Sequence, residues 1–266
     1  PQEDQGYLFS VFSLPPASAL DRTAAARDEL TERASQIPEV QKITSFAGFD
    51  LIVRAQRSNA GIAFIQLNDW SERTGAGQDA QSVAFKIMGA GAAIDEAQVF
   101  AFVPPPILGI SLTGGVEAFL QSRVGADPKE LQEIADRFVA AANARPELSN
   151  VRATLTTNVP RYRIDLDREK TKTLGVPIDD VFDAMQATFG SLYVNDFTLF
   201  GRNYQVNLQS ESDFRERPEN LRKVFVKTET GELAPLTSFL AVHRVLGADI
   251  VQRFNVFTAT KVLAEP

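Results

Sequence analysis

Strand-like and helix-like patterns alternate along the first hundred residues. Residues 6–14 (GYLFSVFSL) alternate apolar and polar side chains, which is typical of a half-buried strand. A helical pattern follows, with Ser18 as its expected N-cap, and Pro38 ends it. The predicted order is strand, helix, strand, strand, helix, strand, at residues 6–14, 19–37, 40–49, 61–68, 78–93 and 97–103. Two consecutive strand–helix–strand units predict a split βαβ sandwich over 6–103, with both helices on one face of an antiparallel sheet.

A third unit of the same kind begins after this sandwich. A strand is expected within 111–124, and a helix begins at Asp127, where Pro128 and Glu130 complete a capping pattern. The next strand is expected at 150–155. The helix carries an apolar stripe made of Leu131, Ile134, Ala135, Phe138, Val139 and Ala142.

The fourth unit does not follow directly, which indicates an insertion. Strands, a helix and turns fill about 156–248, and a long alternating strand returns only at 250–264. We therefore expect three domains, at 1–103, at 104–155 plus 249–266, and at 156–248. The second of these would lack its last helix and strand within this sequence. The predicted fold class is α+β, with repeated split βαβ (ferredoxin-like) sandwiches and an inserted α+β domain.

Composition excludes several kinds of site. The chain has no cysteine and one histidine, so thiol nucleophiles, sulfur-ligated metals and multi-histidine metal sites are excluded. His243 lies in a strand-like segment with no Ser/Asp constellation nearby, and Asp165 and Asp167 lie among arginines, which favours an ion-paired surface over acid–base chemistry. No glycine pattern matches a nucleotide loop. We expect no catalytic residue, metal or cofactor, and the net charge of −7 argues against nucleic acid.

Phenylalanine is the informative aromatic residue, with 19 copies against one tryptophan and four tyrosines. Five of them fall in three strands of the first domain: Phe46, Phe49, Phe64, Phe100 and Phe102. They are either ordinary core or the lining of a cleft. The connection 49–60 is apolar and too long for a plain hairpin, so we expect a loop that covers such a cleft as a lid. A phenylalanine-lined cleft suits apolar or amphipathic ligands.

Ordered motifs over some 250 residues carry a family resemblance. PQEDQGYLF, LPPASALDRT, SNAGIAFIQLNDWSER, RYRIDLDREKTKTLGVPIDDV and GSLYVNDFTLFGRNYQV, followed by PLTSF and RFN, occur here in one order. Together they resemble the second periplasmic loop of hydrophobe/amphiphile exporters of the resistance–nodulation–division (RND) superfamily, of the AcrB type. The resemblance implies that 1–103 is a first porter subdomain, 104–155 plus 249–266 a second, and 156–248 a docking subdomain that helps form a funnel.

The same resemblance implies which residues meet substrate. A deep pocket would be lined by Phe46, Phe49, Leu51 and Phe64. An access pocket would be lined by Phe100, Phe102, Arg152, Lys261 and Leu263. Residues 48–57 would form a switch loop between them, which in this family carries several glycines. Here only Gly48 remains, while Asp50 and Arg54 add charge, so the loop has less backbone freedom. Asp50, if it faces the cleft, would favour cationic amphiphiles.

By resemblance, then, the chain is part of a proton-driven multidrug efflux transporter. It would be a periplasmic loop of a bacterial inner-membrane protein, and not an enzyme. The implied partners are two further copies in a homotrimer, a periplasmic adaptor protein, an outer-membrane channel and small amphiphilic substrates. A soluble ferredoxin-like ligand sensor is the alternative. An acylphosphatase-like enzyme is a third interpretation, but the sequence has no compact nucleophile or phosphate loop for it.

Overall fold

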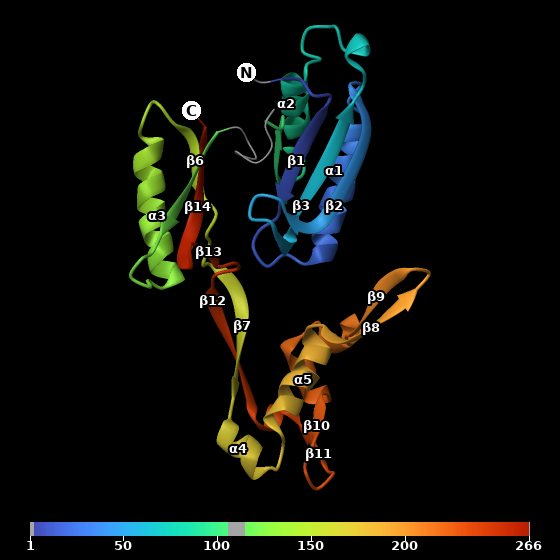
Figure 1. Cartoon of the computed structure of the whole chain (residues 1–266), viewed down its shortest axis with the longest axis vertical. Helices are drawn as coiled ribbons and strands as arrows, with labels where there is room; N and C mark the ends of the chain where they lie inside the picture. Colours follow the sequence, from blue (N-terminus) through green and yellow to red (C-terminus); the bar gives the residue numbers. More distant parts are fainter. Residues whose placement is uncertain (1–2, 106–114, 266) are drawn as a thin grey trace. The chain divides into compact units, whose positions relative to one another are not determined.

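The computed structural model describes residues 3–105 and 115–265, which divide between two compact units. Unit 1 contains the described residues up to Pro160 and those from Leu246 onward, and unit 2 is Arg161–Val245. The chain therefore leaves unit 1 once and returns to it (Figure 1). The α+β fold class predicted from the sequence is confirmed, since helices pack on several antiparallel sheets.

The first part of unit 1 is the predicted split βαβ sandwich. Its strands form one antiparallel sheet in the order β2-β3-β1-β4, so the first strand lies between the third and the fourth. The elements are β1 (Tyr7–Ser13), α1 (Leu20–Ser35), β2 (Val40–Asp50), β3 (Ala55–Leu67), α2 (Ala80–Gly91) and β4 (Gln98–Phe102). Ser18 is not the N-cap of α1, because its hydroxyl donates to the carbonyl of Pro15 and Ala19 takes that position without a side-chain bond.

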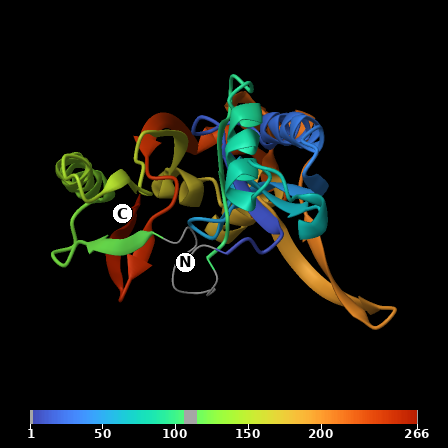
Figure 2. The same cartoon turned by 90° about the horizontal axis from the view of Figure 1, so that it is seen from above.

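Helices α1 and α2 cover the same face of this sheet (Figure 2). The burial of β1 alternates along its whole length, and Leu8, Ser10 and Phe12 point to the helices. Leu8 packs with Ile65 and Ile87 under α2, and Phe12 packs with Leu30 of α1. Because successive strand residues point to opposite faces, Tyr7, Phe9 and Val11 lie on the face opposite α1 and α2, which we call the helix-free face of this sheet.

Gly91 lets α2 approach this sheet closely. A Cβ atom at Gly91 would lie 2.4 Å from Cβ of Val99 on β4, whereas nothing lies within 4 Å of a Cβ at Gly89. We expect Gly91→Ala to lower the free energy of unfolding by about 1–3 kcal/mol through overpacking. Gly89→Ala, the matched control, should raise it by about 0.5–1 kcal/mol through helix propensity. Urea unfolding followed by circular dichroism measures both, and equal effects would contradict the close approach.

A buried arginine ties the start of the chain to the loop before α2. The Arg73 side chain is 1% exposed and donates to both carboxylate oxygens of Asp4, at 2.9 and 3.1 Å. It also donates to the carbonyls of Asn68 and Gln78. Asp4 accepts from the amides of Gly6 and Ala80 as well. We call Asp4 and Arg73 the N-terminal latch.

Acid should weaken this latch. Burial raises the pKa of Asp4, but the hydrogen bonds from Arg73, Gly6 and Ala80 outweigh it and lower that pKa from 3.8 to about 2. A depressed folded-state pKa gives stability that is present above the unfolded pKa and lost as pH falls. We expect the free energy of unfolding to fall by about 1–2 kcal/mol as the pH falls from 3.8 to about 2. Urea midpoints in this range measure the loss, and the account fails if Asp4→Asn shows the same pH dependence.

The second part of unit 1 is a smaller sheet covered by α3 (Pro128–Asn143). Strand β14 (Phe257–Glu265) lies between β5 (Val116–Gln121) on one side and β6 (Ser149–Ala153) with β13 (Gln252–Phe254) on the other. The predicted cap is confirmed, since the Asp127 carboxylate accepts from the amide of Lys129, and Pro128 opens the helix. Residues 111–114 of the predicted strand segment lie outside the described residues.

One sequence expectation fails in this part. Residues 250–264 are not one strand, because Asn255 and Val256 both have positive φ and turn the chain between β13 and β14. Two successive residues with positive φ are typical of a two-residue hairpin turn, but valine rarely takes a positive φ, so the sequence did not indicate a turn there. The stripe on α3 is only partly buried: Leu131, Ala135 and Ala142 pack inward, while Ile134 and Phe138 are exposed.

Unit 2 has its own core, formed by Val176, Val181, Leu221, Val226, Leu236 and Phe239. Strands β7 (Val159–Leu166) and β12 (Leu240–Gly247) pair where the chain enters and leaves this unit. Between them follow α4 (Arg168–Thr173), α5 (Ile178–Phe189), β8 (Leu192–Leu199), β9 (Arg202–Leu208), α6 (Ser212–Arg215), β10 (Phe225–Lys227) and β11 (Leu233–Pro235). Unit 2 also has a six-residue 3-10 helix at Pro218–Lys223 and a three-residue one at Leu236–Ser238. In unit 1, Trp70–Glu72 is a third.

Candidate ligand-binding face

The helix-free face of the first sheet carries a chain of aromatic rings. The rings of Phe46, Phe64 and Phe9 follow one another across β2, β3 and β1, with centroids 6.2 and 5.3 Å apart and edge-to-face geometry. Phe102 and Phe100 on β4 continue the series, with centroid separations of 5.8 and 5.9 Å. Spacings of this size are favourable for aromatic pairs. We call these five residues the aromatic array.

Part of the array is exposed. Phe46 is 51% exposed and Phe64 41% exposed, on the sheet face opposite the one that packs against α1 and α2. They line a pocket of about 370 Å³, which we call the apolar pocket; it also contains Gly48, Phe49, Leu51 and Ile62. The structure thus brings Phe46, Phe49, Leu51 and Phe64 together. Their role toward substrate stays a prediction.

A second pocket of about 430 Å³ lies at the other side of the hairpin between β2 and β3. Phe100 and Arg152 both line it, and the guanidinium of Arg152 lies 5.1 Å from the centroid of the Phe100 ring. Asp50, Arg57 and Gln98 contribute polar groups to the same pocket. An arginine over a phenylalanine face is a cation–π contact, which leaves an apolar edge beside a fixed positive charge.

Three of the expected access-pocket residues line neither of these pockets. Phe102 is 6% exposed within the array, and Leu263 is buried beside Arg152 in the second sheet. Lys261 is buried too, and its Nζ lies 2.6 Å from Oε1 of Glu117 and 5.5 Å from the centroid of the Phe119 ring. Glu117 therefore already neutralises the charge of Lys261.

The expected lid is a short turn. Strand β2 runs to Asp50 and β3 begins at Ala55, so only residues 51–54 connect them, and the expectation of a long loop over 49–60 is wrong. The turn was not predicted because Leu51–Val53 are apolar and lack the residue types typical of turns. Strand β2 also has a bulge between Ala47 and Phe49, where Gly48 has a φ of +95°. Arg54 is exposed in the turn with φ 55°.

Charged side chains hold this hairpin in place. Asp50 Oδ1 accepts from the amides of Ile52 and Val53, which forms the turn. Asp50 Oδ2 lies 3.0 Å from Arg57, and the same guanidinium lies 2.7 Å from Asp249, between β12 and β13. Asp50 therefore positions this turn, and because Arg57 is shared with Asp249 the three side chains together carry a net negative charge. The preference of Asp50 for cationic ligands stays a prediction.

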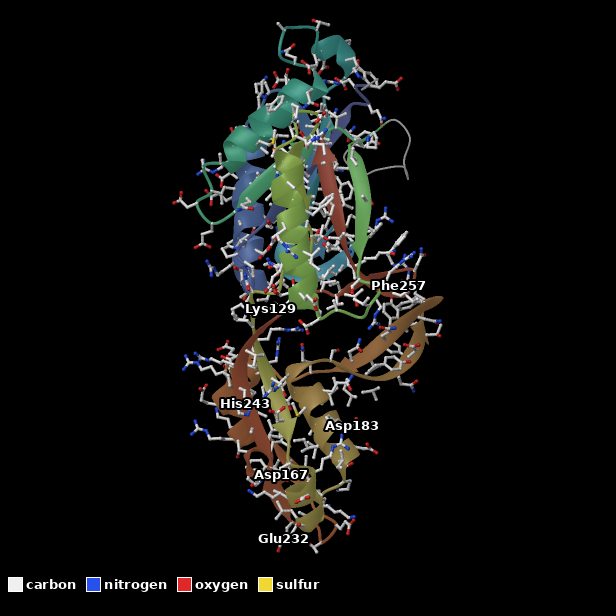
Figure 3. All side chains as sticks on the ribbon, turned by 90° about the vertical axis from the view of Figure 1, so that its left-hand side faces the viewer. Lys129, Asp167, Asp183, Glu232, His243 and Phe257 are labelled. Atoms are coloured by element: carbon white, nitrogen blue, oxygen red, sulfur yellow. The ribbon has the colours of Figure 1, made fainter. Side chains whose placement is uncertain are left out.

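Two carboxylates of unit 2 that the sequence analysis considered, Asp165 and Asp167, have structural partners. Asp165 lies 3.2 Å from Arg163 and 3.5 Å from Nε2 of His243 on β12, all well exposed. Asp167 caps α4 by accepting from the amide of Lys170 (Figure 3). Across residues 3–105 and 115–265, no three histidine, aspartate or glutamate side chains gather as metal ligands would.

Residues 1–266 match the AcrB/AcrD/AcrF family from end to end. The chain belongs to this family. Among its relatives, the toluene efflux pump membrane transporter TtgE of Pseudomonas putida is 32% identical over 270 residues, and the multidrug/solvent efflux pump membrane transporter MepB of the same species is 33% identical over 274. The multidrug export protein AcrF of Escherichia coli is 28% identical over 268 residues.

These alignments cover 100% of this AcrB/AcrD/AcrF-family chain but only 25% of TtgE and MepB and 26% of AcrF. The chain thus spans about a quarter of the length of these relatives, of which TtgE and MepB are membrane transporters. In the part that the structure describes, no helix has the length and apolar character needed to cross a membrane.

Sequence reasoning missed two residues of this family member's site. Phe9 contacts both Phe64 and Phe102 and so joins the two halves of the array. Phe9 could have been predicted from the sequence, because Tyr7, Phe9 and Val11 alternate along the strand with the residues that point to the helices. Arg57 had no such signal, because its partner Asp249 is 192 residues away.

Proposed function

We propose that this chain is the periplasmic, substrate-binding part of an efflux transporter that exports amphiphilic compounds. The observation that carries the proposal is the aromatic array, whose exposed rings line the apolar pocket on the sheet face opposite α1 and α2. Each phenylalanine side chain that a ligand buries fully contributes about 1.5–3 kcal/mol. Such contacts lack direction, so they favour binding of many apolar shapes.

Substrate would meet two surfaces in this scheme. An access pocket would have a wall formed by Phe100 and Arg152, with Phe102, Lys261 and Leu263 behind them. The deep pocket would be formed by Phe46, Phe49, Leu51 and Phe64. The hairpin at 51–54 would separate them. The rest of the scheme follows the resemblance of the sequence motifs. It has porter subdomains at 1–103 and at 104–155 plus 249–266, and a docking subdomain at 156–248. Transport would be proton-driven, by a homotrimer in the inner membrane, with transfer through an adaptor protein to an outer-membrane channel.

Drug susceptibility tests this function in cells. A strain would carry the full-length pump with Phe64→Ala, or with Phe138→Ala as a control, since Phe138 is a similarly exposed phenylalanine on α3. We expect Phe64→Ala to lower the inhibitory concentration of amphiphilic dyes by about fourfold or more at equal expression, because about 1.5 kcal/mol of contact is lost. Equal susceptibility of the two variants would overturn the proposal.

A further inference from the structure

The apolar pocket continues into a polar one. A neighbouring hollow of about 360 Å³ shares Phe64 and is otherwise lined by Gln5, Gly6, Tyr7, Lys42, Thr44, Ile65 and Gln66. Lys42 pairs with Gln66 and Thr44 pairs with Phe64 in the β2–β3 register, so these four residues lie on one face. From Lys42 to Phe46 the strand runs about 13 Å, at roughly 3.3 Å per residue. The two pockets are thus neighbours that meet at Phe64, and together we call them the groove, with a polar and an apolar end.

Lys42 is the one charged side chain lining either end of this groove, within the described part of the chain. It is exposed, and no carboxylate pairs with it among the described residues. Other basic groups of the same sandwich differ in this respect: Lys86 lies 2.7 Å from Glu39, and Arg73 binds Asp4. Asp4, next to the groove residue Gln5, is therefore already neutralised. The polar end has a net positive charge.

We propose that this groove selects amphiphiles with an anionic head group, such as a carboxylate or sulfate, on a medium-length apolar tail. The head lies beside Lys42 with the hydroxyl and amide groups of Thr44 and Gln66, and the tail lies on Phe64 and Phe46. The inference rests on the proposed function and adds a charge preference to it. An exposed ion pair is weak, so the tail supplies most of the affinity and Lys42 supplies discrimination.

The single tryptophan of the chain is placed to report binding. The Trp70 ring packs on Gly6, with its Cζ2 3.4 Å from where a Gly6 Cβ would be, and Gly6 lines the polar end of the groove. Fluorescence titrations of the 266-residue chain would use decanoate, decyl maltoside and decyltrimethylammonium below their micellar concentrations. Equilibrium dialysis gives the same dissociation constants without relying on Trp70. We expect decanoate to bind about three- to fivefold more tightly than the cation.

Substitutions separate this inference from the proposed function. Lys42→Gln should remove the preference for decanoate and leave the affinity for decyl maltoside unchanged. The control Lys129→Gln on α3 (Figure 3) should leave both the preference for decanoate and the affinity for decyl maltoside unchanged. Phe64→Ala should weaken all three ligands. If wild-type protein binds decyl maltoside but shows no charge preference, or if Lys42→Gln weakens all three ligands equally, the inference is overturned and the proposed function stands. If none of the three binds, both fail.

Discussion

Replacing Arg73 by methionine is expected to lower the free energy of unfolding of unit 1 by about 3–5 kcal/mol. Methionine keeps an apolar stem of similar length but none of the donors. The Asp4 carboxylate then loses two hydrogen bonds, and the carbonyls of Asn68 and Gln78 lose one each. Arg73 is 1% and Asp4 25% exposed, so removing the guanidinium leaves a largely buried carboxylate without its partner, which is costly. Urea unfolding at neutral pH, followed by Trp70 fluorescence and by circular dichroism, measures this loss.

A surface ion pair of similar length is the control. Arg22 lies 2.7 Å from Glu96, but both side chains are more than half exposed. Arg22→Met should therefore cost less than about 1 kcal/mol. If Arg22→Met and Arg73→Met lower the stability equally, burial does not determine the strength of the N-terminal latch.

Replacing Arg57 by methionine should lower the free energy of unfolding by about 2–3 kcal/mol and make the hairpin between β2 and β3 open more often. The Arg57 side chain is 14% exposed and lies between the carboxylates of Asp50 and Asp249. Without it, two negative charges face a pocket with no compensating guanidinium between them, and Asp50 is freed to leave its turn. Hydrogen exchange measured by mass spectrometry should then show faster exchange at the amides of Ile52 and Val53, which Asp50 now protects.

Arg54 provides the matched variant in the same hairpin, since it is exposed and lies in the turn itself. Arg54→Met should leave exchange at Ile52 and Val53 unchanged and alter stability by less than about 0.5 kcal/mol. Comparable exchange in the two variants would show that the charge network does not hold the hairpin.

Periodicity was sufficient to predict the first sandwich because its patterns are local. The buried side of β1 alternates along seven residues, and Pro38 ends a helical pattern that begins near Leu20. Turns were harder, because their residue types gave no signal. Leu51, Ile52 and Val53 are apolar yet lie in a turn, and Val256 adopts a positive φ that valine rarely takes.

The site divides in the same way. Phe46 and Phe64 could be grouped from strand pairing and resemblance, and they do lie together. The partner of Lys261 could not be predicted, because Glu117 is distant in sequence and meets it only through the pairing of β14 with β5. The Arg57–Asp249 contact depends on the return of the chain after unit 2 and is equally invisible in the sequence.

The central claim is that the aromatic array binds apolar ligands, and direct binding of a neutral fluorescent naphthylamine to the 266-residue chain tests it. The titration compares wild-type protein with Phe9→Ala, Phe64→Ala and Phe138→Ala, each checked by circular dichroism. We predict about tenfold weaker binding for Phe64→Ala, a smaller loss for Phe9→Ala, and wild-type affinity for Phe138→Ala, because only the first two remove rings from the array. Equal affinity in all four proteins would contradict the account.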